Sequence, residues 1–208
     1  MNSELIRKDF PILETKVKGH PVVYFDNGAT TQRPLPVMRA VMDYVTRNNG
    51  NPHRGAHIFA MSASEAYDTS KTVVKDFIGA KSEKEIIYTR NTSESLNLVA
   101  RSYGETHLKE GDRILIPVSE HHSNLVPWQR AAKKTGAVLE YMYVDKETGH
   151  FPEEELKKID DPRVKILAFA QVSNVLGLSI DARALIRRAH KHLSLIHISE
   201  PTRHSLIS

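Results

Sequence analysis

Short apolar runs alternate with amphipathic stretches from residue 85 to residue 192, and this alternation constrains the fold more than any other feature of the sequence. The apolar runs predict strands at 85–89, 113–118, 138–144 and 164–172. The stretches between them repeat apolar residues every three or four positions, which predicts helices at 93–107, 125–134, 152–159 and 181–192. Because strands that alternate with helices are joined by crossovers, we expect an α/β fold with a mainly parallel sheet flanked by helices.

The pattern before residue 85 is less regular. A brief apolar run at 22–25 predicts a strand that leads into a cluster of turn-forming residues. A stretch of helical period at 34–48 predicts one helix. A second helix is expected to begin at Ser62 or Ser64 and to end at Gly79.

Charge and composition exclude several classes of protein. The 29 Lys and Arg residues exceed the 25 Asp and Glu residues by only four, and they are scattered, so we expect no nucleic-acid partner. The absence of cysteine excludes disulfides, a thiolate metal site and a thiol nucleophile within these residues. The N-terminus lacks the apolar region of a signal peptide, and no run approaches the ~18 apolar residues of a membrane span. We therefore expect a soluble cytoplasmic protein that does not bind a membrane.

Polar residues follow the predicted strands, where the carboxyl ends of a parallel sheet form a ligand-binding crevice. After the strand at 85–89, residues 90–94 lead into a helix. The free backbone N–H groups and hydroxyls at such a helix start can bind a phosphate. The alternative is a capping box, in which Asn91 caps the helix and Glu94 reaches back. The two interpretations are compatible.

Two further strand ends carry side chains that suit an aromatic cofactor. His121 follows the strand at 113–118, and an imidazole there can stack on a pyridine ring and move protons near neutral pH. The adjacent His122 is expected to make structural hydrogen bonds, because a zinc site would need further ligands. Asn174 follows the strand at 164–172 and can donate to a cofactor or substrate oxygen, although a lone asparagine is more often a turn former.

A fourth polar segment, residues 52–57, joins the two predicted N-terminal helices. Arg54 is well shaped for bidentate carboxylate binding, with a surface salt bridge as the alternative. His53 and His57 have the spacing of helical metal ligands, but Gly55 argues against a stable helix. We expect no metal site here.

Taken together and in this order, these segments resemble the SufS-type cysteine desulfurases. These enzymes belong to the class V aminotransferase group, whose members have fold type I and use pyridoxal 5'-phosphate (PLP). The segments that carry the resemblance are 24–31 (YFDNGATT), 53–55 (HRG), 90–94 (RNTSE), 120–124 (EHHSN) and 172–177 (VSNVLG). The resemblance extends over roughly residues 10–192.

The resemblance implies a role for each matching residue. Thr92 and Ser93 would bind the cofactor phosphate, and Asn174 would donate near the phenolate oxygen of the ring. His121 would stack on the ring and would be the catalytic residue that assists proton transfer. The residues expected on the substrate side are Ala29, His53 and Arg54.

The implied activity is the conversion of L-cysteine to L-alanine with formation of an enzyme persulfide, whose sulfur goes to an acceptor protein of iron–sulfur cluster assembly. The resemblance also implies a homodimer, with Arg90 and Glu94 near its interface. A selenocysteine lyase of the same class would share these residues. A phosphate- or nucleotide-binding α/β module is a further alternative, although no G-x-G-x-x-G or G-K-[ST] string follows a strand.

The resemblance covers about the first half of a full-length family member. It implies that residues 1–20 belong to a small domain and residues 21–192 to a partial large PLP-binding domain. The lysine that carries the cofactor, the aspartate that pairs with its ring nitrogen and the persulfide-forming cysteine are expected beyond His192, so we expect the fragment itself to be inactive. Residues 193–208 resemble a translated sequencing adapter and are interpreted as a non-native tail. A natural C-terminal strand is the alternative.

Overall fold

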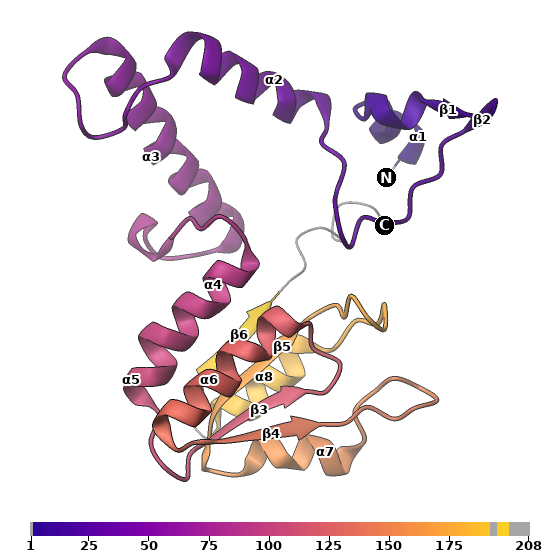
Figure 1. Cartoon of the computed structure of the whole chain (residues 1–208), viewed down its shortest axis with the longest axis vertical. Helices are drawn as coiled ribbons and strands as arrows, with labels where there is room; N and C mark the ends of the chain where they lie inside the picture. Colours follow the sequence, from indigo (N-terminus) through magenta and orange to yellow (C-terminus); the bar gives the residue numbers. More distant parts are fainter. Residues whose placement is uncertain (1, 192–194, 200–208) are drawn as a thin grey trace. The chain divides into compact units, whose positions relative to one another are not determined.

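The computed structural model describes residues 2–191 and, as backbone alone, residues 195–199. The chain divides into two compact units, Met1–Tyr88 and Thr89–Ser208, whose positions relative to one another are not determined (Figure 1). Within the described residues, no helix is both long enough and apolar enough to cross a bilayer.

The N-terminal unit is mainly helical. Its elements are helix α1 (Ser3–Arg7), a 3-10 helix at Pro11–Glu14, strands β1 (Lys16–Val17) and β2 (His20–Pro21), helix α2 (Leu35–Asp43), a π-helical turn at Tyr44–Asn48, helix α3 (Ile58–Ile78) and a 3-10 helix at Glu83–Glu85. Strands β1 and β2 pair antiparallel. Helix α3 ends at Gly79, whose φ of 70° is the left-handed conformation that glycine adopts without strain. Both helices predicted in this unit are confirmed.

Three predictions for residues 22–89 are wrong. Residues 22–25 have no regular structure, although the Val22 N–H donates to the Thr15 carbonyl oxygen and so extends the β1–β2 hairpin. Residues 86–89 also have no regular structure, because no strand among the described residues pairs with them. Helix α3 begins at Ile58, earlier than predicted, because the His57 Nδ1 atom accepts from the Ala60 N–H and caps it.

The C-terminal unit contains a four-stranded parallel sheet in the order β4-β3-β5-β6. The strands are β3 (Arg113–Pro117), β4 (Val138–Met142), β5 (Val164–Ala170) and β6 (Leu195–Ser199). Each strand that was predicted between residues 113 and 172 is present within two residues of its predicted ends. The prediction of a mainly parallel sheet is therefore confirmed.

Helices cover both faces of this sheet (Figure 1). They are α4 (Thr92–Val99), which continues through a π-helical turn at Ala100–Gly104 into α5 (Glu105–His107), then α6 (Val126–Thr135), α7 (Glu153–Lys157), which continues as a 3-10 turn at Lys158–Asp160, and α8 (Ala182–His190). Ile114 and Ile116 point to one face and pack with Trp128 of α6. Leu115, between them in sequence, packs on the other face with Leu185 of α8. This alternation divides the core into two layers.

Strand β6 falls within the segment that we interpret as a non-native tail. Its backbone pairs with β5 from Ile166↔Leu195 to Ala170↔Ser199. An apolar segment of high β-propensity pairs with an open sheet edge whatever its origin, so the pairing does not test that interpretation. Residues 192–194 and 200–208 lie outside the described residues.

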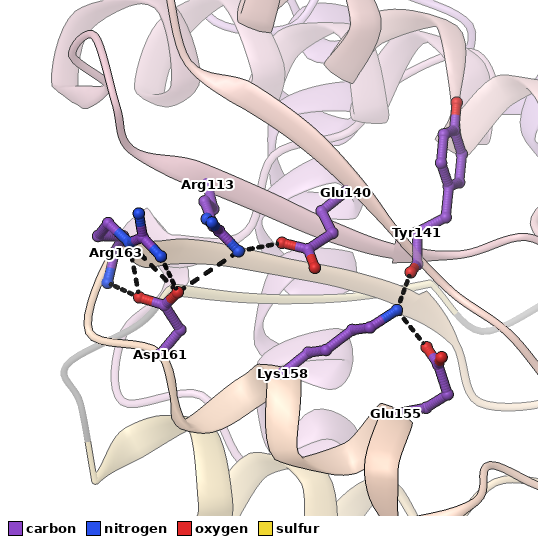
Figure 2. A network of polar contacts seen from close by, with 7 residues as sticks. All are labelled: Arg113, Glu140, Tyr141, Glu155, Lys158, Asp161 and Arg163. Carbon is purple, nitrogen blue, oxygen red and sulfur yellow. Dashed lines mark hydrogen bonds and ion pairs between the residues drawn. The ribbon is translucent and has the colours of Figure 1, made fainter.

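Side chains from α7 and the turn after it bind the outer edge of β4 (Figure 2). The Lys158 Nζ atom donates to the Tyr141 carbonyl oxygen at 2.9 Å and pairs with Glu155 at 2.6 Å. The Glu155 carboxylate in turn accepts from the Tyr143 N–H at 3.0 Å. Side chains therefore satisfy one C=O of the edge strand and the N–H of the residue that follows it, which discourages pairing with another chain.

Candidate functional site

The candidate site lies where the strands of the C-terminal unit end. Strands β3 and β5 are adjacent and parallel, so the segments that follow them, residues 118–124 (the His121 loop) and 171–181 (the Asn174 loop), leave the same end of the sheet. Helix α4 packs against the 3-10 turn His122–Asn124 within the His121 loop. The sheet thus brings together two of the polar segments that the sequence predicted, and the packing of α4 on the His121 loop adds the third, residues 90–94.

The start of α4 combines a variant of the capping box, in which Glu94 reaches back to the residue before the N-cap, with unused donors. The Asn91 Oδ1 atom accepts from the Glu94 N–H at 2.9 Å, and the Glu94 carboxylate accepts from the Arg90 N–H at 2.7 Å. The Arg90 N–H and guanidinium hold the pKa of Glu94 below its usual value. The backbone N–H groups of Thr92 and Ser93 donate to nothing in the described part of the chain, and both side chains are exposed. The cap and an anion site therefore coexist at this helix start.

The ring of His121 is oriented by its own loop. Its Nδ1 atom accepts from the Ser123 N–H at 3.1 Å and lies 2.8 Å from the Ser123 Oγ atom. A ring nitrogen that accepts from a backbone N–H carries no proton, so the neutral ring is protonated at Nε2. His121 is exposed, and the His122 ring meets it edge-on at a centroid distance of 6.2 Å. The exposed Nε2 position is therefore the one available for proton transfer.

Glu120, which the sequence analysis did not single out, ties the His121 loop to the sheet. Its Oε1 atom accepts from the N–H of Ala170, the last residue of β5, at 2.7 Å. Its Oε2 atom accepts from the Asn124 Nδ2 atom at 2.8 Å, and the Asn124 Oδ1 atom accepts from the Trp128 Nε1 atom at 3.0 Å. Burial raises the pKa of Glu120, and the donors Asn124 and Ala170 oppose that rise. The sequence signal was a carboxylate and an amide one helical turn apart, directly before an amphipathic helix.

The Asn174 loop has an ordered base and an exposed tip. The Ser173 Oγ atom accepts from the Val175 and Leu176 N–H groups at 3.2 and 3.1 Å, and Val172 forms an antiparallel bridge with Ser179. The Asn174 side chain is exposed, and within the described residues it makes no hydrogen bond. Its amide is therefore not engaged by the described part of the chain, and its binding to a ligand stays a prediction.

The residues predicted on the substrate side belong to the N-terminal unit. The Ala29 N–H donates to the Asp26 carbonyl oxygen within the turn that the sequence predicted. His53 has a φ of 60°, which is uncommon for a residue other than glycine, and its N–H donates to the Ser64 Oγ atom at 2.8 Å. Arg54 is exposed. The two units are described separately, so a shared pocket for these residues and His121 stays a prediction.

The residues at the α4 start fit the phosphate of a cofactor such as PLP. Two unused N–H donors and two hydroxyls lie at the positive end of a helix dipole, which favours a dianion by ~1 to 2 kcal/mol. The neighbouring His121 loop supplies an exposed planar ring, and the Asn174 loop supplies a free amide. The end of the sheet thus carries a group for each part of a phosphorylated pyridine: donors for the phosphate, a planar side chain for the ring and an amide for the ring oxygen.

Comparisons with known proteins identify the family. The aminotransferase class-V family model matches residues 23–199. A probable cysteine desulfurase of Synechocystis sp. is 45% identical over 186 residues, which cover 89% of this chain and 44% of the relative. A second, from Halalkalibacterium halodurans, is 44% identical over 192 residues, covering 92% and 47%. The apo structure of the cysteine desulfurase from Thermococcus onnurineus NA1 superposes with a TM-score of 0.85 at 40% identity, covering 95% of this chain and 47% of that chain.

The chain spans about half the length of the curated relatives that it matches. The resemblance to cysteine desulfurases of the class V aminotransferase group and the predicted fold are confirmed, and PLP is the cofactor of this family. With its parallel sheet flanked by helices and a family model that matches most of its length, the chain belongs to the class V aminotransferases, PLP-dependent enzymes of fold type I.

Proposed function

We propose that this chain forms the phosphate- and ring-binding part of a PLP-dependent cysteine desulfurase of the SufS type. The enzyme converts L-cysteine to L-alanine and transfers the sulfur to a cysteine of its own. Two observations together carry the proposal. The backbone N–H groups of Thr92 and Ser93 at the start of α4 have no acceptor among the described residues, and the His121 loop, which Glu120 binds to β5, packs against the same helix. The cysteine desulfurase names of the relatives support it.

Each residue of the site has a physical task in this proposal. Thr92 and Ser93 bind the phosphate through backbone N–H groups and hydroxyls, which fixes the position of the ring. His121 stacks on the ring and accepts or releases a proton at Nε2, since Ser123 occupies Nδ1. Asn174 donates to the phenolate oxygen. When bound, PLP supplies the electron sink that stabilises negative charge at the substrate Cα.

The remaining parts of the activity are proposed for the whole protein. We propose that Ala29, His53 and Arg54 face the substrate and that the protein works as a cytoplasmic homodimer. Its sulfur serves an acceptor protein of iron–sulfur cluster assembly. The cofactor-bearing lysine and the persulfide cysteine are proposed to belong to a C-terminal half, so the 208-residue chain alone does not turn over L-cysteine.

A chimera tests this proposal. Residues 1–191 are joined to the C-terminal half of the Synechocystis relative, which is 45% identical over the matched region. We expect the chimera to bind PLP, seen by its absorbance, and to release alanine from L-cysteine, whereas the 208-residue chain releases none. An assay with L-selenocysteine in parallel separates a desulfurase from a selenocysteine lyase.

Point variants of the chimera test the individual residues. Thr92→Ala with Ser93→Ala is expected to weaken PLP binding by about tenfold or more, because two phosphate-binding hydroxyls are removed. Ser102→Ala, a hydroxyl on the exposed surface beyond α4, is the matched control. A chimera that binds PLP equally well with and without the two hydroxyls would contradict the proposed phosphate site.

A further inference from the structure

We propose that Glu120 is the positioning residue that holds His121 at the rim of the sheet, and that Asn124 and Trp128 set its orientation. This inference rests on the proposed function, because it assigns the structural support of the proposed proton-transfer residue. Glu120 touches neither Thr92 nor Ser93 by hydrogen bond, and its described partners are Asn124 and Ala170. It therefore acts through the loop and not on a ligand.

Two groups that can only donate, the Trp128 indole and the Ala170 backbone N–H, fix the direction of the hydrogen bonds that join Trp128, Asn124, Glu120 and Ala170. The indole N–H of Trp128 can only donate, and Trp128 is fully buried. The Asn124 amide must therefore turn its oxygen toward Trp128 and its Nδ2 group toward Glu120. The Ala170 N–H is a second fixed donor. A side chain at position 120 must accept two hydrogen bonds, which a carboxylate does and an amide in the same place does not.

His121 lies between the two anchored residues. Glu120 is bound to β5 across a separation of 50 residues in the chain, and the Asn124 N–H donates to the His121 carbonyl oxygen at 2.8 Å. The His121 backbone is thus held on both sides, and Ser123 holds its ring. Because Asn124 is buried beside Trp128, a mismatch at Glu120 cannot be relieved by turning the amide. Loss of the Glu120 contacts is expected to release the whole loop.

Exchanging the two polar groups provides a sharp test. Glu120→Gln sets an amide N–H against the donor of Asn124 or Ala170, and Asn124→Asp sets two carboxylates against each other. The double variant Glu120→Gln with Asn124→Asp restores every bond: the Trp128 N–H and the Gln amide donate to the new carboxylate, and the Ala170 N–H donates to the Gln oxygen. The double variant also keeps the net charge. Glu154→Gln, on the exposed side of α7, is the charge-matched control.

The first readout needs no cofactor. Trp128 is the single tryptophan of the chain, so the 15N-labelled 208-residue protein gives one indole N–H signal. We expect Glu120→Gln to shift this signal and the His121 ring signals, and we expect the double variant to return both toward their original positions. The second readout is PLP binding by the chimera, which Glu120→Gln weakens about tenfold and the double variant restores.

The results separate the two proposals. Unchanged His121 signals in a folded Glu120→Gln protein would overturn the positioning role, and so would a folded double variant that fails to restore them. If the His121 signals respond as expected but the unsubstituted chimera does not bind PLP, the proposed function fails while the structural support of His121 stands.

Discussion

Asp161, which precedes β5, provides the clearest electrostatic prediction for the C-terminal unit. Its carboxylate accepts from the Arg163 backbone N–H at 2.9 Å and from the Arg163 Nη2 atom at 2.7 Å, and it lies 3.4 Å from the Arg113 Nη1 atom (Figure 2). Arg113 also binds Glu140 of β4 at 2.6 Å. Asp161→Asn therefore removes the charge that neutralises two guanidinium groups while it keeps the shape of the side chain.

The size of the effect follows from the pKa of Asp161. The Arg163 guanidinium and N–H, with a smaller contribution from Arg113, lower that pKa from 3.8 to about 2. At about 1.4 kcal/mol per pKa unit this corresponds to an upper limit of about 2.5 kcal/mol. The side chain is 19% exposed, so solvent and salt screen part of this energy. We expect Asp161→Asn to lower the free energy of unfolding at pH 7 by about 1 to 2 kcal/mol.

The lowered pKa of Asp161 also predicts how its contribution to stability changes with pH. A carboxyl whose pKa is lower in the folded state stabilises the fold above its unfolded pKa, and this stabilisation is lost as the pH falls through the folded value. The difference between the original protein and Asp161→Asn is therefore expected to be full at pH 7, to shrink below about pH 4, and to be mostly gone at about pH 2.

Urea unfolding followed by the fluorescence of Trp128, which is fully buried in the same unit, measures this difference at each pH. Glu154→Gln removes an exposed carboxylate from α7 and serves as the control, with an expected change within about 0.5 kcal/mol. Equal stabilities of Asp161→Asn and Glu154→Gln at pH 7, or a difference that persists unchanged to pH 2, would show that the Asp161 charge does not stabilise the fold.

Three further substitutions test local features. Lys158→Met frees the Tyr141 carbonyl oxygen at the β4 edge and is expected to increase aggregation measured by light scattering, whereas Lys157→Met on the exposed surface should not. Asn91→Ala removes the α4 cap and is expected to cost about 1 kcal/mol in urea unfolding; no loss would show that Asn91 does not stabilise the helix. Gly79→Ala forces a φ of 70° on a residue with a Cβ atom and is expected to cost about 1 kcal/mol in the N-terminal unit, measured by circular dichroism; an unchanged stability would argue against strain there.

Local patterns predicted the elements of the C-terminal unit well. The apolar run at 113–118 predicted a strand that is buried on both faces, and the structure places Ile114 and Ile116 in one core layer and Leu115 in the other. The capping pattern at Asn91 and Glu94 was also visible, because a cap depends on residues three apart in the chain. The rule that ligands bind at the ends of parallel strands pointed to His121 and Asn174, which follow β3 and β5. It pointed to Ser93 through a strand at 85–89 that the structure lacks, and the helix start at residues 92 and 93 reaches this region because α4 packs against the His121 loop.

Local sequence patterns were therefore enough to predict which segments form helices and central strands and which polar residues follow the strands. The folded structure was needed for the strand order β4-β3-β5-β6, for the absence of strands at 22–25 and 86–89, and for the hydrogen bond that Glu120 accepts from Ala170. The physical reason is that a strand exists only beside a partner that accepts its hydrogen bonds, and a contact across 50 residues depends on how the sheet assembles.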